Sequence, residues 1–335
     1  MSNGKAAAKM KVRHRRELTL KDIFVYLLFV AIILIAGLID RRFFTASNFL
    51  VICKQTATTA VVAFGMTFAI TGGEIDLAVG GVACLSGMTA AFVLERTNSI
   101  VLASLAGLSV GVVFGLMNGF LIAKVKMVAF LSGLGVESVT TGIALTMTNQ
   151  KPITIYNQGF TNFWGKATIL GIPVIVFWTF GIFAFCFILY KFTPYGNHVK
   201  ACGGNRTAAI FSGIKTDRIV MSFMLLSGVC ASLCGMMTVS RMNQGRPDIG
   251  SSFCLDAITA VVLGGTPFTG GSGSVLTSLI GAFVITTLTN ALVIAGVPTT
   301  AQTIVKGIVV IVAVTISTRD IRLSRKRKTE KENEA

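Results

Sequence analysis

The stretch TGGEIDLAVGGVACLSG, Thr71–Gly87, joins two apolar runs through a glycine-rich break that carries two carboxylates. Gly72 and Gly73 can take backbone angles that end a helix, and Asp76 suits the N-cap of a helix resuming at Leu77. Such a break at a membrane span must lie at the interface or face protein or water, because hydrocarbon offers free N–H and C=O groups no partner. The sequence therefore predicts a helix break, either a capped turn between two spans or a gate.

Composition predicts an all-α membrane protein with many spans. The chain has 335 residues, of which 53% are hydrophobic and 13% are charged. A soluble domain carries about 25% charged residues, so apolar membrane helices account for this composition better. The seven cysteines lie mostly inside apolar runs, as small packing residues do. No cleavable signal peptide is expected, because no small-residue cleavage site follows the first apolar run.

Ten apolar runs approach the ~20 residues that a membrane helix needs, and we expect about ten transmembrane helices. The predicted spans are residues 23–39, 51–70, 77–94, 100–123, 128–148, 172–190, 219–240, 256–265, 275–294 and 302–317. A double glycine, Gly264 and Gly265, predicts a second helix break at the end of the eighth span. The segment 266–274 after it is either a turn between two crossings or a re-entrant turn.

The net charge of +16 is concentrated at the two ends of the chain. Basic segments flanking apolar spans are typical of cytoplasmic segments, and ten spans return both ends to one side. This pattern predicts contact with anionic membrane lipids and no nucleic-acid binding. The expected organisation is a cytoplasmic basic tail over 1–22, a transmembrane domain over 23–318 with a cytoplasmic loop over 191–218, and a cytoplasmic charged tail over 319–335.

Several kinds of chemistry lack the residues they need. No G-x-x-x-x-G-K-[ST] phosphate loop occurs, so the chain is not expected to hydrolyse ATP by that route. His14 and His198 both lie outside the predicted spans, which excludes a histidine-ligated zinc site in the membrane. We expect no catalytic, cofactor-binding or metal-binding residues on this chain, and no enzyme. Glu137 and Lys306 are ionisable residues within spans, and an ion-coupled carrier usually needs more such groups.

Two further segments, together with the opening stretch, carry a resemblance to a known family. They read YGNHVKACGGNRTAAIFSGIKT at 195–216 and RPDIGSSFCLDAITAVVLGGTPFTGGSGS at 246–274, and IVKGIVVIVAV follows at 304–314. In order and spacing the set resembles the permease subunits of bacterial ABC importers for simple sugars, of the ribose, galactose and autoinducer-2 type. The resemblance covers nearly all of residues 20–318.

The sequence departs from that family's pattern at three places. Glu74 stands between Gly73 and Ile75, KMVAF at 126–130 replaces a proline pair before phenylalanine, and Glu137 replaces an apolar residue. The last two departures touch the expected substrate path. The resemblance therefore does not transfer the identity of the sugar.

This resemblance implies a permease that forms the translocation path of an ATP-driven, binding-protein-dependent importer in the bacterial inner membrane. It implies three protein partners: an ABC ATPase subunit with fused nucleotide domains that binds ATP and Mg²⁺, a periplasmic or surface sugar-binding protein, and a second permease chain, as a homodimer or heterodimer. The alternative hypothesis is an ion-coupled secondary transporter that works without an ATPase.

The loop 191–218 contains the predicted contact with the ATPase. Asn205 suits an N-cap and Gly213 a helix end, so a short helix is expected between them. A helix this short is unstable alone in water and needs a partner surface. That surface is either the chain's own spans or, as the resemblance implies, the ATPase. The predicted coupling residues are Asn205, Ala208, Ala209, Phe211 and Gly213.

Polar or aromatic residues within spans are candidates for lining the path, and the alternative for each is helix packing. The candidates are Phe64, Asn118, Phe130, Glu137 and Asn290. Asp256 is expected to cap a helix rather than to bind sugar. Lys306 either extends toward the interface or pairs with a carboxylate.

Overall fold

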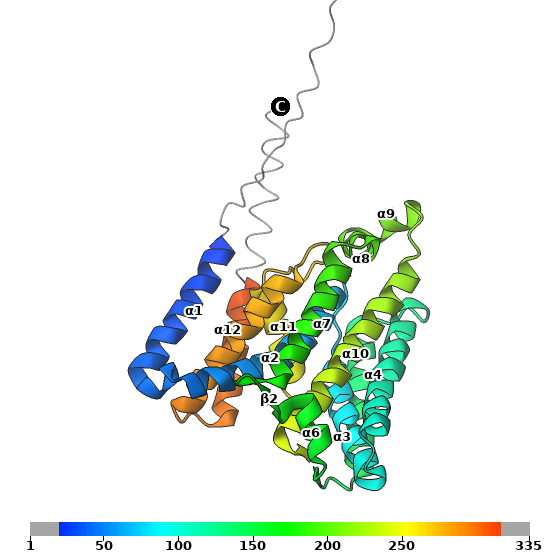
Figure 1. Ribbon diagram of the computed structural model, residues 1–335. Helices are drawn as coiled ribbons and strands as arrows, with labels where there is room; N and C mark the ends of the chain where they lie inside the picture. The colour runs from blue at the N-terminus through cyan, green and yellow to red at the C-terminus, as the bar shows by residue number, and fades with distance from the viewer. Residues whose placement is uncertain (1–19, 316–335) are drawn as a thin grey trace, which may run out of the picture.

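The computed structural model describes residues 20–315, and this part of the chain is predominantly helical (Figure 1). Seven of its helices are long and apolar enough to cross a membrane, and three shorter apolar helices accompany them. In chain order these ten helices match the ten predicted spans, so the predicted all-α, polytopic fold is confirmed. The seven long helices are α2 (Ala46–Thr71), α3 (Val79–Thr97), α4 (Ile100–Ala123), α5 (Ala129–Met147), α7 (Val174–Lys191), α10 (Thr216–Met242) and α12 (Val275–Ile294).

The first two spans begin earlier than predicted. Helix α1 (Leu20–Ile39) starts three residues before the predicted boundary, and the tails over 1–19 and 316–335 lie outside the described residues. A short 3₁₀-helix, η1 (Arg41–Phe44), follows α1. Helix α2 then starts at Ala46 rather than at 51, because Thr45 caps it by accepting a hydrogen bond from the backbone N–H of Asn48.

Helix α10 lies at the centre of the bundle and packs against α2, α3 and α4. The glycines along α4 face α10, and a Cβ added to Gly111 would lie 2.3 Å from the carbonyl oxygen of Gly228. A side chain at Gly111 would therefore force the helices apart. Such close packing is typical of glycines between membrane helices.

The eighth predicted span, 256–265, forms a helix within three residues of its predicted bounds, but it falls short of the ~20 residues expected of a membrane crossing. Helix α11 (Phe253–Leu263) has 11 residues, about 16 Å, which is roughly half the ~30 Å of a bilayer core. Asp256 is not its N-cap, which is Ser252. Both Asp256 carboxylate oxygens instead lie 2.9–3.0 Å from Nζ of Lys306, on a helix over Thr299–Thr315. This buried ion pair fastens the half-length helix to the last described one.

The segment 149–170, between the fifth and sixth predicted spans, has structure of its own at the end opposite α8 and α9. Helix α6 (Gln158–Thr161) leads into a π-helix, η2 (Asn162–Lys166), and two short antiparallel sheets flank them. The rings of Trp164 and Trp178 stack at 4.9 Å, which ties this segment to α7. The sheets pair β1 (Ile153–Thr154) with β4 (Gln244–Gly245), and β2 (Thr168–Ile169) with β3 (Ile172–Pro173).

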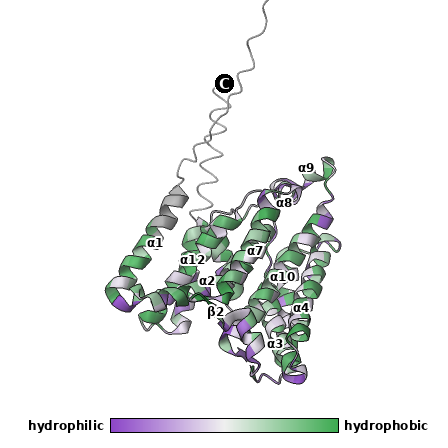
Figure 2. Ribbon diagram, viewed as in Figure 1, coloured by the Kyte–Doolittle hydropathy of each residue, from purple (hydrophilic) through white to green (hydrophobic). Residues whose placement is uncertain are grey.

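The opposite end of the bundle holds the short helices α8 (Pro194–Gly204) and α9 (Arg206–Phe211), and the first residue of α1 lies at this same end (Figure 1). Hydrophobic residues run along α7 and the coloured part of α1, while hydrophilic residues gather near helix ends (Figure 2). On α7 the exposed side chains include Phe177, Phe180 and Phe185. Such a face suits contact with lipid.

Candidate gating and coupling site

The loop over residues 72–78, hereafter the gate loop, follows the end of α2 at Thr71. The backbone N–H of Gly73 donates to Ile70, that of Glu74 donates to Ala69, and Gly73 has a φ of +85°. This is a Schellman motif, which glycine favours because it tolerates the left-handed conformation. The predicted break at Gly72 and Gly73 is therefore present.

The same motif ends α11 and α9. At α11, Gly265 has a φ of +92° and donates to Val262, while Thr266 donates to Val261. At α9, Gly213 has a φ of +80° and donates to Ile210. The helix breaks predicted at Gly264–Gly265 and at Gly213 are therefore also present.

Glycines from three segments meet beside the gate loop, and we call Gly73, Gly203, Gly204, Gly270 and Gly271 the glycine junction. The backbone N–H of Gly271 donates to the carbonyl of Thr71 at 2.8 Å. A Cβ added to Gly203 would lie 2.0 Å from that same oxygen, and one added to Gly270 would lie 2.9 Å from the Cα of Gly73. The end of α2, the end of α8 and the loop before α12 thus touch backbone to backbone.

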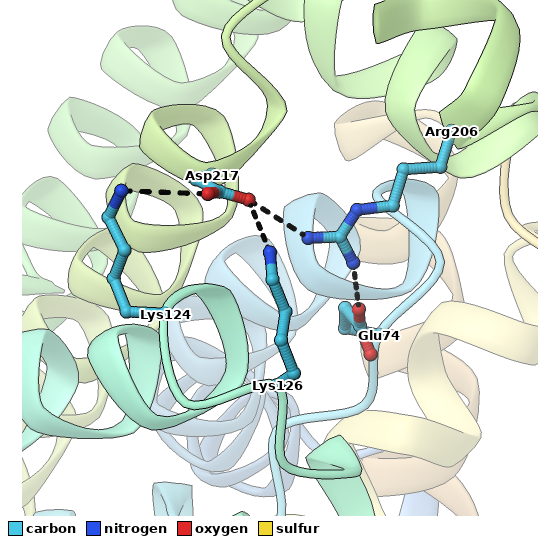
Figure 3. Close-up of polar contacts among 5 residues, drawn as sticks. All are labelled: Glu74, Lys124, Lys126, Arg206 and Asp217. Carbon is cyan, nitrogen blue, oxygen red and sulfur yellow. Dashed lines mark hydrogen bonds and ion pairs between the residues drawn. The ribbon is translucent and has the colours of Figure 1, made fainter.

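A cluster of charged side chains lies beside the gate loop, and Arg206 of α9 contacts Glu74 of that loop (Figure 3). Arg206, the first residue of α9, places Nη1 3.2 Å from Oε1 of Glu74 and Nη2 3.6 Å from Oδ1 of Asp217. Asp217 also pairs with Lys126 at 2.8 Å and with Lys124 at 3.6 Å. Burial raises the pKa of the Glu74 carboxyl, and the positive charge of Arg206 opposes that rise.

Asp76 lies deeper, in a buried polar network. Its Oδ1 accepts hydrogen bonds from the backbone N–H of Ala78 at 3.1 Å and from Nδ2 of Asn118 at 3.0 Å. The hydroxyl of Ser132 in turn donates to Oδ1 of Asn118 at 2.6 Å. Asn118 is five residues before the end of α4, so the network sits about 8 Å inside that end of the bundle. The gate loop therefore re-enters the bundle with its polar groups paired within the protein.

The predicted capping role of Asp76 is wrong in position. Helix α3 begins at Val79 and its N-cap is Ala78, because residues 77–78 form a turn before the helix starts. A side chain from another helix pairs with a backbone N–H in the first turn of α3. The carboxylate of Glu137, on α5, accepts a hydrogen bond from the backbone N–H of Gly81. Negative charge is favoured there, because the free N–H groups of a helix start carry partial positive charge.

The segment that precedes α11 lies against this same helix start. A Cβ added to Gly80 would lie 2.6 Å from the carbonyl oxygen of Gly250 and 3.2 Å from Oε1 of Glu137. Two interrupted spans therefore meet inside the bundle beside the Glu137 carboxylate. One is the gate loop with α3, and the other is the 244–252 segment with α11. Interrupted helices that meet near the middle of a membrane are typical of transporter binding sites.

The five predicted path residues lie in different surroundings. Asn118 and Glu137 flank the start of α3, as described above. Phe130 is exposed on α5 and Phe64 is fully buried, with its ring centroid 5.7 Å from that of Phe183. Asn290 is buried at the other end of the bundle, where its amide exchanges two hydrogen bonds with that of Asn48, at 2.9 and 3.0 Å. The structure brings together only the first two.

Helix α9 forms where the sequence predicts it, within the loop 191–218. Oδ1 of Asn205 accepts a hydrogen bond from the backbone N–H of Ala208 at 3.0 Å, which confirms the predicted N-cap. Ala209, however, is 4% exposed and packs on this chain, so it offers little surface for the predicted coupling contact. A helical turn has one inner face, and here Ala209 occupies it. Phe211 is 88% exposed and projects outward.

Sequence reasoning missed the residues that connect these parts. Arg206 and Asp217 are charged residues in a basic loop, a setting that does not single them out. Gly203–Gly204 and Gly270–Gly271 are visible as double glycines, the same signal that marked Gly72–Gly73. Their meeting at one junction depends on tertiary structure and could not be derived from spacing.

Comparison with known proteins places the chain in a family. The family model described as "Branched-chain amino acid transport system / permease component" matches residues 48–314. The ribose import permease protein RbsC of Bacillus subtilis is 39% identical over 285 residues, covering 84% of this chain and 88% of its own. The D-allose transport system permease protein AlsC of Escherichia coli is 32% identical over 292 residues, covering 87% and 89%.

Other relatives agree with these two. The ribose import permease protein RbsC of Haemophilus influenzae is 36% identical over 292 residues, covering 86% of this chain and 90% of its own. No solved structure matches the chain. The predicted resemblance to sugar importer permeases is confirmed by these relatives, and it favours a permease component over an ion-coupled carrier. The chain belongs to this family of transport-system permease components.

Proposed function

We propose that this chain is the membrane subunit of an ATP-driven importer for a monosaccharide. The proposal is supported by relatives named as permeases for ribose, D-allose and L-arabinose, each aligned over more than four fifths of both chains. A periplasmic or surface binding protein delivers the sugar, and a separate ATPase subunit with fused nucleotide domains binds ATP and Mg²⁺. The chain supplies the path and no catalytic residue.

The observation that carries this proposal is that α9 is a short helix with an exposed apolar end. This helix has six residues, ends in an outward Phe211 that is 88% exposed, and lies at one end of the bundle. Six residues cannot form a stable helix alone, and an exposed phenylalanine beside Ile210 offers an apolar contact. A groove on the ATPase would bury this contact, with Asn205 and Gly213 defining the two ends of the helix and Ala208 on its exposed side.

The gate loop and the starts of α3 and α11 form the proposed gate. Asp76, Asn118 and Glu137 surround these interrupted helices, and the breaks at Gly72–Gly73 and Gly264–Gly265 allow their ends to change direction. Phe130 and Glu137 are seven residues apart on α5 and thus share a face, which supports both as path residues. Phe64 and Asn290 remain predicted path residues without further support.

A second permease chain is proposed against α5. One stripe of its outward face is small or polar, beside exposed apolar residues such as Leu131 and Ile143. The stripe includes Gly135, Ser138, Gly142 and Thr146. Small residues allow close helix approach in a membrane, and hydroxyls gain hydrogen-bond partners there. We place the assembly, a homodimer or heterodimer, in the bacterial inner membrane, with α8, α9 and both chain ends on the cytoplasmic side.

Reconstitution tests the proposal. The permease, its ATPase and its binding protein are placed in liposomes, with D-ribose, D-allose and L-arabinose offered as labelled probes. We expect uptake only with internal ATP and the binding protein present. Uptake by the permease chain alone on a proton or sodium gradient would contradict the proposal and support the ion-coupled carrier.

A further inference from the structure

Arg206 is the point where α9 meets the gate loop through side chains. It occupies the first turn of α9, and its guanidinium reaches Glu74 at 3.2 Å (Figure 3). Glu74 is the acidic residue that interrupts the glycine-isoleucine-aspartate pattern of the gate loop. Among the residues whose side chains the structure describes, all within 27–315, Arg206 is the one basic residue that forms an ion pair with Glu74. Glu74, which departs from the family pattern, therefore has an ion-pair partner on α9.

We propose that the Arg206–Glu74 ion pair is the link by which movement of α9 reaches the gate loop, which makes both residues positioning residues for transport. The inference rests on the proposed function, in which α9 docks on the ATPase. It goes further by naming the contact that carries the movement onward from α9.

The other charged residues of the cluster do not replace the contact between Arg206 and Glu74. The closest cation to Asp217 is Lys126, at 2.8 Å, so its carboxylate keeps a partner whether or not Arg206 is present. Arg206 approaches Asp217 only at 3.6 Å, beyond normal hydrogen-bond length. Its shorter contact is with Glu74. One terminal nitrogen of the Arg206 guanidinium therefore lies near Asp217, and the other contacts Glu74 of the gate loop.

The burial of Glu74 gives the link its strength. Its side chain is 20% exposed and that of Arg206 is 36% exposed, so water screens the pair less than it would on an open surface. Removing Arg206 would leave a largely buried carboxylate without its cation. At the same place the glycine junction joins the end of α8 to the end of α2 through backbone alone. The end of α8 thus contacts the gate loop through backbone atoms. The next helix, α9, contacts the same loop through the Arg206–Glu74 ion pair.

The test measures ATP-dependent movement of the gate loop in the assembled complex. A single cysteine replaces Ile75 in a cysteine-free complex of permease, ATPase and binding protein held in nanodiscs. Its rate of maleimide labelling is compared between the nucleotide-free complex and the complex trapped with Mg-ATP and vanadate. The variants are Glu74→Gln, Arg206→Gln and Arg206→Lys, with Lys124→Gln as the matched control, because Lys124 contacts the same cluster without touching Glu74.

We expect the two nucleotide states to differ in labelling rate in the parent complex. Glu74→Gln and Arg206→Gln should shrink that difference at least about fivefold, the lower end of ordinary coupling between sites. Arg206→Lys should retain most of it and Lys124→Gln all of it. The ATPase should copurify with every variant. A labelling difference that persists in Arg206→Lys but not in Arg206→Gln would show that the positive charge is required, and not only a side chain that fills the space.

Several results would overturn the proposal. One is an unchanged labelling difference in Glu74→Gln and Arg206→Gln with the ATPase still bound. Another is loss of the ATPase from Arg206→Gln alone, which would show that Arg206 contacts the ATPase directly. Loss of the ATPase from both variants would show that the pair only shapes the docking surface. Failure of the proposed function itself would appear separately, as a parent complex that does not bind the ATPase.

Discussion

At the scale of single residues, the buried Asp76 carboxylate holds the gate loop inside the bundle. It accepts hydrogen bonds from Ala78 and Asn118, and its side chain has almost no contact with solvent. We expect Asp76→Leu to lower the free energy of unfolding by about 2–3 kcal/mol, because it leaves buried donors without an acceptor. Asp76→Asn keeps an acceptor oxygen and should cost less. Reaction of a thiol dye with the buried cysteines during heating measures both, with the exposed Asp248→Asn as control.

Glu137 is the second carboxylate at this site, and its substitution separates stability from transport. Glu137→Gln keeps an oxygen that can accept the hydrogen bond from Gly81, so thermal stability should stay near that of the unmodified protein. The lost charge should change the apparent affinity or the turnover of sugar uptake, because the side chain is half-buried beside the interrupted helices. Uptake kinetics measured in liposomes check this. Unchanged kinetics together with unchanged stability would assign Glu137 to helix packing.

At the scale of elements, the contact between α4 and α10 determines which glycines can change. Gly111→Val should destabilise the protein by at least about 2 kcal/mol, since a Cβ there would lie 2.3 Å from the carbonyl oxygen of Gly228. Gly142→Ala on α5 is the matched control, because a Cβ there meets nothing within 4 Å and alanine favours helix. Melting temperatures in detergent compare the two. Equal melting temperatures would show that the α4–α10 packing is looser than described.

Local signals in the sequence predicted the elements, whereas their meeting points required tertiary structure. The double glycines at 72–73 and 264–265 predicted two breaks because the Schellman motif depends on neighbouring residues alone. The bounds of α11 were predicted to within three residues, whereas local signals did not predict that residues 246–252 enter the bundle without being helical. Ala209 looked available for docking, but which face of a short helix is buried depends on the helix beneath it. The pairing of Glu74 with Arg206 joins residues 132 positions apart, and no periodic pattern marks it.

At the scale of the whole molecule, the topology assigns opposite sides of the membrane to the two ends of the bundle. A single cysteine at Tyr156, whose side chain is 86% exposed, should react with a membrane-impermeant thiol reagent added outside cells. One at Thr207, in α9, should react only after the cells are opened. Both variants are made on a cysteine-free background. Labelling of position 207 from outside would reverse the assignment and remove α9 from the side of the ATPase.

The central claim is that the ATPase drives this permease through α9, and Phe211 tests it most directly. Phe211→Asp places a charge on the most exposed apolar side chain of that helix, where docking would bury it unpaired. Phe211→Leu keeps the apolar contact and serves as the control. The measurement is copurification of the ATPase with each variant from membranes. We predict normal permease abundance for both, at least about tenfold less ATPase with Phe211→Asp, and near-normal ATPase with Phe211→Leu. Full ATPase recovery and ATP-driven uptake with Phe211→Asp would contradict the account.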